Sequence, residues 1–428
     1  MNMSKWYFIL VLFSVIVSCS SDDASTPPDD ASTPPDDPAR RTVVVYMSAE
    51  NDLGYGFLTQ DISEMKRARS QVAPNENLVL FVDMPSSREK PFIAKVTTTG
   101  QLDTLYRYDH DFYASDPGMM AEVLNKAIAL CPATEDYGLV LWGHANGWII
   151  ETDSIEASRR AYGRDDGTDT GTSSSKWLNI PSLRKTLEAT GIKWKFILAD
   201  CCNMINAETA YELRDRTDYL IGAPSEIPGV GAPYLTVLKD LFLHNDEALY
   251  TGICDDYYEL IYSHFHTPMA AVRMEMMPVL AEATREILPK VNDFMQGKGA
   301  TQGMIYYYSR PTDWMSDDDE KTLYDMNDVV RTALGADSEA YKNWKKVLDE
   351  TVIYKRESKR WQTNNLIIFS DFTETVNTQL VFKHGDGSYG GISMFFPMDK
   401  YKTTSHQYNE TIKKMAWYYA VGWSALGW

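Results

Sequence analysis

The chain has 428 residues, of which 44% are apolar and 24% charged, a composition typical of globular proteins and not of disordered ones. Its 60 acidic and 41 basic residues give a net charge of −19, so no nucleic-acid partner is expected. Five cysteines and seven histidines, with no CxxC pair and no HExxH motif, argue against a disulfide scaffold and against the common zinc sites.

Residues 1–18 predict a secretory signal. One lysine precedes an apolar run from Trp6 to Val17, which is shorter than the roughly 20 residues that span a bilayer. The run ends in Ile-Val-Ser-Cys, which resembles a bacterial lipobox, so we expect lipidation at Cys19 and attachment to a membrane through it. An ordinary signal peptide with an incidental cysteine is the alternative.

Residues 19–40 predict a disordered acidic tether. The sequence DDASTPP occurs twice in a row and contains no apolar side chain larger than alanine, so it cannot join a core. Acidic residues just after Cys19 resemble an export signal of surface lipoproteins, although a plain acidic linker would look the same. We expect the protein to be anchored in the envelope of a Gram-negative bacterium, at the outer membrane. The sequence allows either the periplasmic or the external face of that membrane.

From Arg41 onward, apolar runs alternate with helical patterns and predict an α/β fold with a mostly parallel sheet flanked by helices. Residues 92–108 predict a hairpin inserted between these elements. The expected strands are 42–46, 78–82, 137–142, 194–199 and 219–222, and the expected helices include 117–130 and 204–214. Ligands of such sheets bind beyond the carboxyl ends of the strands.

We expect residues 41–428 to form one domain, with a core of about 41–235 that carries the parallel strands and a C-terminal portion of about 236–428. The C-terminal portion is mostly helical by pattern, with additional strands expected at 365–369 and 391–396, in the same sheet or an adjoining one.

Two residues capable of nucleophilic chemistry follow neighbouring expected strands. His144 follows the third strand and Cys202 the fourth, so both belong to one edge of a parallel sheet. An imidazole beside a thiol promotes thiolate formation and later protonates the leaving amine. We also expect Cys202 to open the next helix, where N–H groups favour an anion, and Gly143, Ala145 and Cys202 to supply an oxyanion hole. On spacing alone, a buried structural cysteine or a Cys201–Cys202 disulfide is an alternative.

Two long motifs make the chain similar to the clostripain family of cysteine peptidases. LVLWGHANGW resembles the family's apolar strand followed by Trp-x-His-Gly-x-Gly-Trp, and DCCNMINAETAYEL resembles Asp-Ala-Cys-Leu-Met followed by Glu-x-Ala-Tyr-Glu-Leu. VVVYMSAENDL, SEIPGVGAPY and YGGISMFFP resemble further family segments, so the similarity runs from about Val43 to Pro397. The resemblance places Cys202 at the nucleophile position. It implies a caspase-like α/β fold, shared with gingipains and legumain, with additional C-terminal helical and β elements.

The resemblance also implies a cysteine endopeptidase that cleaves proteins or peptides after Arg or Lys. Asp200 matches the acid of the family's specificity pocket, where a carboxylate pairs with a guanidinium or ammonium group. A cap on the following helix is the alternative role for Asp200. Ser225 and Glu226 match the wall of the same pocket, although Glu226 could equally be a solvated loop charge.

Three departures from the family pattern keep a second function open. Ala145 stands where the family has glycine, and alanine resists the positive φ that an oxyanion turn could require. Cys201 and Asn203 replace Ala and Leu, and a reversible Cys201–Cys202 disulfide would silence the enzyme. The alternative is a non-catalytic surface lipoprotein that uses the fold to bind a peptide or a partner protein. We expect a monomer.

The polar segment between His144 and Cys202 predicts an activation loop, because such segments are accessible to proteolysis. Family members are often processed there after a basic residue, and a plain surface loop is the alternative. The candidate processing residues are Arg159, Arg160, Arg164 and Lys176. The cluster Asp165-Asp166-Gly-Thr-Asp169 loosely resembles a calcium loop but lacks EF-hand spacing, so Ca²⁺ is kept open without being required and no metal ligand is assigned.

Overall fold

The computed structural model describes residues 39–85, 89–149, 161–167, 175–262, 265–311, 319–358, 361–362, 387–402 and 407–428. Residues 1–37 separate from a compact unit of residues 38–428, which is the part considered below. The lipidation candidate Cys19, the processing candidates Arg159 and Arg160, and the strand expected at 365–369 lie outside the described residues. Within those residues, every helix is too short or too polar to cross a membrane.

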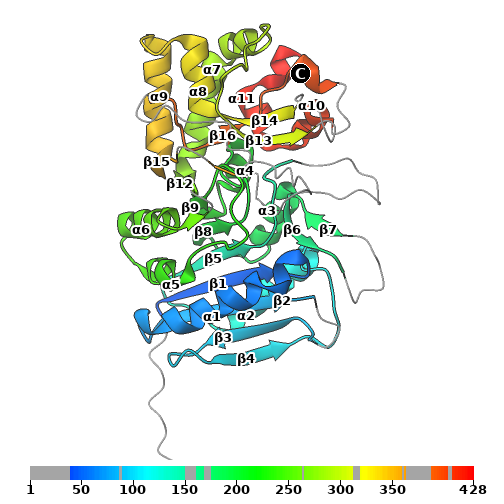
Figure 1. The fold of residues 1–428 in the computed structure, drawn as a ribbon, viewed down its shortest axis with the longest axis vertical. Helices are drawn as coiled ribbons and strands as arrows, with labels where there is room; N and C mark the ends of the chain where they lie inside the picture. Colours follow the sequence, from blue (N-terminus) through cyan, green and yellow to red (C-terminus); the bar gives the residue numbers. More distant parts are fainter. Residues whose placement is uncertain are drawn as a thin grey trace, which may run out of the picture. The chain divides into compact units, whose positions relative to one another are not determined.

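A nine-stranded sheet forms the centre of this unit, in the order β15-β12-β9-β8-β5-β1-β2-β3-β4 (Figure 1). The five parallel strands match the five expected ones and are β1 (Arg41–Ser48), β2 (Asn77–Asp83), β5 (Asp136–Trp142), β8 (Trp194–Asp200) and β9 (Thr217–Gly222). The antiparallel outer strands are β3 (Phe92–Val96), β4 (Leu102–Arg107), β12 (Met269–Arg273) and β15 (Val352–Arg356).

Both faces of the sheet are buried, because successive strand side chains point to opposite sides. In β1, Val44 and Tyr46 belong to one hydrophobic core, while Val43 and Val45 belong to the other. The second core contains residues of α1 (Phe57–Ala68), α5 (Tyr234–Val237) and α6 (Asp246–Tyr258). The first core contains residues of α2 (Pro117–Leu130), α3 (Ile180–Glu188), α4 (Ala207–Leu213), α7 (Met277–Met295), α8 (Met326–Leu334), α9 (Glu339–Thr351), α10 (Tyr408–Thr411) and α11 (Ala416–Val421). The predicted α/β fold is thus confirmed.

Two elements differ from the expectation. The hairpin of β3 and β4 is part of the main sheet, because β3 pairs antiparallel with β2 along the whole of its length. The helix expected at 204–214 begins at Ala207, because the Asn206 side chain caps it by accepting the Thr209 N–H at 2.7 Å. Residues 201–206 therefore connect β8 to α4 through a non-helical turn.

The C-terminal portion supports this turn. A three-stranded antiparallel sheet consists of β13 (Tyr306–Pro311), β14 (Asp319–Asp325) and β16 (Ser393–Met394), the last lying within the strand expected at 391–396. The Ser393 N–H donates to Ile205 O at 3.1 Å, and the Phe395 N–H donates to Glu208 Oε1 at 2.8 Å. Two further strand pairs are β6 (Tyr162–Asp165) with β7 (Lys176–Leu178) and β10 (Ile261–Tyr262) with β11 (Phe265–His266).

Candidate active site

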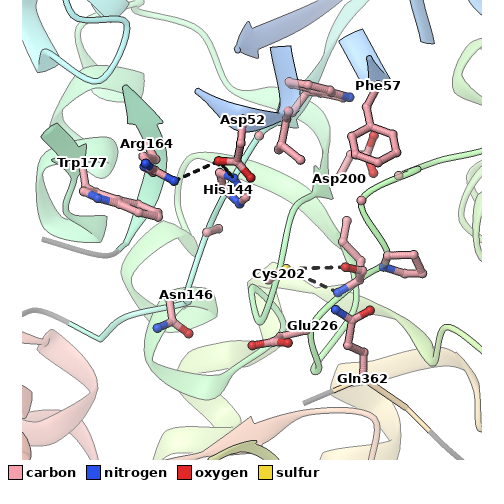
Figure 2. Close-up of a pocket in the computed structure, with 18 of the residues that line it drawn as sticks. Asp52, Phe57, His144, Asn146, Arg164, Trp177, Asp200, Cys202, Glu226 and Gln362 are labelled. Carbon is pink, nitrogen blue, oxygen red and sulfur yellow. Dashed lines mark hydrogen bonds and ion pairs between the residues drawn. The ribbon is translucent and has the colours of Figure 1, made fainter. Parts of the chain in front are cut away.

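A cavity of about 650 Å³ opens at the carboxyl ends of the parallel strands (Figure 2). After β1 the chain continues to β2 on one side, and after β5 it continues to β8 on the other side. The strand order therefore reverses between β1 and β5, which is where sheets of this kind bind ligands. Residues predicted from the sequence that line it are Gly143, His144, Ala145, Arg164, Asp200, Cys202 and Glu226. The lining also includes Asp52, Phe57, Trp177 and Gln362, which the sequence did not single out.

His144 and Cys202 reach this cavity from matched positions on neighbouring strands. Trp142 of β5 lies opposite Asp200 of β8, so each reactive residue lies two positions beyond its strand end. No hydrogen bond joins the two side chains in the described part of the chain. His144 Nε2 is 3.0 Å from Asp52 Oδ1, and Cys202 Sγ accepts the Ile227 N–H at 3.4 Å.

Asp52 is the functional candidate that sequence reasoning missed. It begins a short helical turn directly after β1, whose N-cap Asn51 accepts the Leu53 N–H at 2.9 Å. Figure 2 shows Asp52 between His144 and Arg164, and its Oδ1 lies 2.9 Å from Arg164 Nη1. The hydrogen bond from His144 lowers the pKa of Asp52 to about 2, and the charges of His144 and Arg164 act in the same direction. The feature that could have identified Asp52 from the sequence is its position just beyond the end of β1, beside the point where the strand order reverses.

Arg164 and Lys176 lie in strands, not in an open loop. Arg164 is in β6, where its guanidinium pairs with Asp52 and with Asp166, at 2.9 Å from Nε to Oδ1. The Arg164 carbonyl accepts a hydrogen bond from Asn51 Nδ2 at 2.7 Å. Lys176 is in β7, with its ammonium group 3.9 Å from the centre of the Tyr113 ring. Both processing candidates within the described residues are therefore held in place.

Cys202 lies on a tight turn whose shape depends on Asn203. The φ of Asn203 is 60°, a left-handed conformation that asparagine tolerates better than the leucine of the family pattern. The Asn203 N–H donates to Ser225 O at 2.8 Å, and Asn206 Nδ2 donates to Asn203 O at 2.7 Å. The prediction that Cys202 opens a helix is wrong, because α4 starts only at Ala207.

The two adjacent cysteines have different environments. Both are free thiols in the structure, and Cys201 is fully buried whereas Cys202 is partly exposed to the cavity. Burial raises the pKa of Cys202 to about 12, and the Glu226 and Asp200 carboxylates add to this effect while the Ile227 N–H opposes it. The resting thiol is therefore protonated at neutral pH, and nucleophilic attack requires a base.

Asp200 lines the cavity, and its hydrogen-bond donors among the described residues are all neutral. Its Oδ1 accepts the Ala232 N–H at 2.9 Å and the Tyr257 hydroxyl at 3.0 Å, and its Oδ2 accepts the Tyr234 hydroxyl at 2.7 Å. Since no donor comes from α4, the alternative of a helix cap is wrong. Burial raises the pKa of Asp200 to about 6, although these hydrogen bonds oppose the shift. Two carboxylate oxygens accept about four hydrogen bonds, so one position is left for a ligand.

Glu226 lines the cavity, whereas Ser225 lies behind it. Ser225 is fully buried, and its hydroxyl donates to Glu226 O at 3.0 Å. Together with the hydrogen bond from Asn203, this contact makes Ser225 a support of the Cys202 turn and not a wall of the pocket. Glu226 forms an isolated β-bridge with Gln362, and both residues line the cavity.

The three expected oxyanion donors are not equivalent. The Gly143 N–H already donates to Asp200 O at 3.4 Å. Among the residues that the structure covers, no acceptor receives the N–H of Ala145 or of Cys202. The φ of Ala145 is not positive, so alanine brings no backbone strain where the family has glycine. The glycine that matters is Gly147, with φ of 63°, at which a Cβ would lie 2.6 Å from Asn203 O.

The two acids of the run at 165–169 that the structure describes face different partners. Asp166 pairs with Arg164 and accepts the Ser175 hydroxyl at 2.6 Å. Asp165 is fully buried and faces Glu50 and Asp83 instead. Asp169 lies outside the described residues.

Comparison with known proteins agrees with this geometry. The family model described as the clostripain family, peptidase C11, matches residues 45–428. A secreted C11 cysteine protease from Bacteroides thetaiotaomicron, solved with an irreversible peptide inhibitor, has a TM-score of 0.70 and 24% identity, covering 90% of this chain and 100% of its own. An inactive zymogen C11 protease from Parabacteroides distasonis has a TM-score of 0.69 and 24% identity, covering 90% and 99%.

No curated protein matches the chain. The solved structures establish the caspase-like fold, and the family match covers nearly all of the described unit. The chain therefore belongs to the clostripain family of cysteine peptidases, which hydrolyse proteins or peptides.

Proposed function

We propose that the protein is a lipid-anchored cysteine endopeptidase that cleaves after Arg or Lys. The observation that carries the proposal is the convergence of Cys202, His144 and Asp200 in one cavity at the reversal of strand order. These residues supply a nucleophile, a proton carrier and a buried acid. Cys19 is the proposed lipid attachment site, and the solved relative described as secreted supports a place in the cell envelope.

In the proposed mechanism, Asp52 fixes the orientation of His144. With Nε2 donating to Asp52, the lone pair of Nδ1 takes the proton of Cys202. The thiolate then attacks the substrate carbonyl, and the N–H groups of Ala145 and Cys202 stabilise the oxyanion. His144 returns the proton to the leaving amine, and water hydrolyses the resulting thioester.

The preference for a basic side chain follows from the charges of the cavity. In the described part of the chain, Asp200 accepts hydrogen bonds from neutral donors only. The Asp200 and Glu226 carboxylates both act on the Cys202 thiol. A guanidinium or ammonium group would form an ion pair with one of these acids and be attracted by the other. The same cation would offset the effect of Glu226 and Asp200 on the pKa of Cys202, so a basic substrate promotes formation of its own nucleophile.

Self-cleavage between His144 and Cys202 is part of the proposal. Arg164 is an unfavourable cleavage point, because it lies in β6 and Asn51 binds its carbonyl. Lys176 lies in β7 and packs on the Tyr113 ring, which leaves Arg159 and Arg160, outside the described residues, as the preferred points. The solved relative described as an inactive zymogen supports such an activation step.

The test is hydrolysis of fluorogenic peptides ending in Arg, Lys, Asn or Asp by the mature chain and by a Cys202→Ala control, with reductant. We expect cleavage after Arg or Lys only, lost in the control. Mass spectrometry of the same samples should show two fragments for the active chain and one intact chain for Cys202→Ala. Cleavage after Asn or Asp, or activity in the control, would overturn the assignment.

A further inference from the structure

An aromatic ring, that of Trp177, forms part of the cavity wall and has no role in the proposed mechanism. In Figure 2, Trp177 lies on one side of His144, whereas Cys202 and Asp200 lie on the other. The centres of the Trp177 and His144 rings are 6.3 Å apart, and the two ring planes form an angle of 45°. Trp177 is partly exposed and lines the cavity, so a ligand can reach it.

Backbone pairing holds this ring beside the histidine. Ala145, which directly follows His144, forms an isolated β-bridge with Tyr162 of β6. Tyr162 in turn pairs with Leu178 of β7, the neighbour of Trp177 in the chain. The ring is therefore tied through β6 to the loop that carries His144, and it is in position before a substrate arrives.

The proposed mechanism determines which part of a substrate would meet Trp177. Asp200 would bind the basic side chain that precedes the scissile bond, and Cys202 would attack the carbonyl of that residue. His144 returns its proton to the leaving amine, which must lie within hydrogen-bond reach of the imidazole. The carbon next to that amine carries the side chain that follows the scissile bond, so this side chain lies on the His144 side of the cavity.

We propose that Trp177 forms a subsite for a large apolar or aromatic residue immediately after the scissile bond, an inference that rests on the proposed function. An indole ring offers an apolar face, and a side chain that covers it removes both surfaces from water. Among the residues that the structure describes, no acceptor receives the Nε1–H of Trp177. The ring therefore acts through its faces and its shape.

The charged group beside the ring favours an apolar ligand over a charged one. The Arg164 guanidinium lines the same side of the cavity as Trp177 (Figure 2). It pairs with Asp52 and with Asp166, at 2.9 Å in each case, so an acidic side chain would compete with two carboxylates. A cation can bind an aromatic face, but here the guanidinium would repel it. An apolar side chain needs no charged partner.

The experiment measures kcat/KM of the mature chain on internally quenched peptides that contain one Arg, followed by Phe, Ala, Lys or Glu. Mass spectrometry assigns the products, so that only cleavage after the Arg is counted. We expect kcat/KM for the Phe peptide to exceed that for the Ala peptide about tenfold, with neither charged residue better than Ala. Equal values for the Phe and Ala peptides would overturn the proposal, as would a higher value for the Lys or Glu peptide than for the Phe peptide.

Trp177→Ala should reduce the ratio of the Phe to the Ala peptide to about one. A merely structural role of Trp177, such as support of His144, would lower kcat/KM for both peptides alike, so an unchanged ratio in this variant refutes the subsite. Trp177→Phe keeps an aromatic face and should retain a preference of several fold. If Trp177→Ala does not fold, Trp177→Thr removes the ring with a residue that suits a strand.

The matched control is Phe57→Ala, which removes an aromatic ring that lines the cavity on the Asp200 side (Figure 2). Whatever its effect on the rate, it should leave the ratio of the Phe to the Ala peptide unchanged. An equal fall of the ratio in Phe57→Ala and in Trp177→Ala would contradict a subsite at Trp177.

Labelling of Cys202 by a chloromethyl ketone of arginine separates the subsite from the proposed function, because this probe has no residue after the scissile position. Labelling, together with cleavage after Arg that is indifferent to the next residue, overturns the subsite alone. Absence of both labelling and cleavage overturns the proposed function and the subsite with it.

Discussion

Asp52 and Asp200 are carboxylates of the same cavity, yet their environments shift their pKa values in opposite directions. His144 and Arg164 lower the pKa of Asp52 to about 2, whereas burial among neutral donors raises the pKa of Asp200 to about 6. Asp52 thus has its partners, His144 and the cationic Arg164, within the protein. The side beside Asp200 receives its cation from the substrate under the proposed function. Under the proposed function, the contrast separates a carboxylate that orients His144 from one that selects the substrate.

Asp200→Asn should have the largest effect of the variants that test this contrast. Asparagine keeps the shape and can still bind the tyrosine hydroxyls, but it cannot neutralise a guanidinium group. We expect kcat/KM for Arg and Lys peptides to fall on the order of 10³-fold, since removing one partner of a buried ion pair costs about 3–5 kcal/mol. Steady-state kinetics on Arg and neutral peptides would measure the loss, and an equal loss on both would contradict a specificity role.

Asp52→Asn tests the other carboxylate. An amide at this position removes the carboxylate that orients the His144 ring, so kcat should fall by about 10²-fold with KM nearly unchanged. Asp166→Asn is the matched control, because Asp166 also pairs with Arg164 but does not contact His144. A fall in kcat as large for Asp166→Asn as for Asp52→Asn would show that the effect comes through Arg164.

Gly147→Ala tests whether the loops carrying His144 and Cys202 must approach closely. A Cβ there would lie 2.6 Å from Asn203 O and from Asn206 Nδ2, at a φ of 63°. Gly191→Ala is the control for backbone strain alone, because its φ is 70° and no atom lies within 4 Å of the added Cβ. We expect Gly147→Ala to lower the free energy of unfolding by about 2 kcal/mol more than Gly191→Ala in denaturant titrations. Equal losses would argue against a close approach.

Glu226→Gln should produce the smallest change. The Glu226 carboxylate raises the pKa of Cys202, so its removal should shift the thiol's titration toward lower pH. We expect the pH profile of iodoacetamide alkylation to move downward by about half a unit, since the neighbouring charge is only one of several causes. The reference is the unmodified chain under the same conditions, and an upward shift would contradict the sign.

The strand pattern and the two long motifs were sufficient to predict the parallel sheet, His144 and Cys202 at one edge of it, and Asp200 beside them. Periodicity could not show the turn after β8, because Asn203 takes a left-handed φ that apolar spacing does not encode. Nor could it show that the Ser225 hydroxyl faces inward to Glu226 O.

The chain of contacts from His144 through Asp52 to Arg164 could not be predicted from the sequence for a different reason. Asp52 and Arg164 are 112 residues apart, and only the pairing of β1 with β5 and the position of β6 bring them together. The cluster of Glu50, Asp83 and Asp165 is equally non-local, so the acidic run at 165–169 does not reveal the neighbours of Asp165.

The hydrogen bonds from Ser393 and Phe395 to the segment after Cys202 also bear on the order of folding. Phe395 and Glu208 are 187 residues apart, so this contact forms only after nearly the whole chain has left the ribosome. A nascent chain that already includes His144, Asp200 and Cys202 still lacks the strand that supports the turn of the nucleophile. The topology therefore delays the contact that supports the nucleophile turn until synthesis is nearly complete.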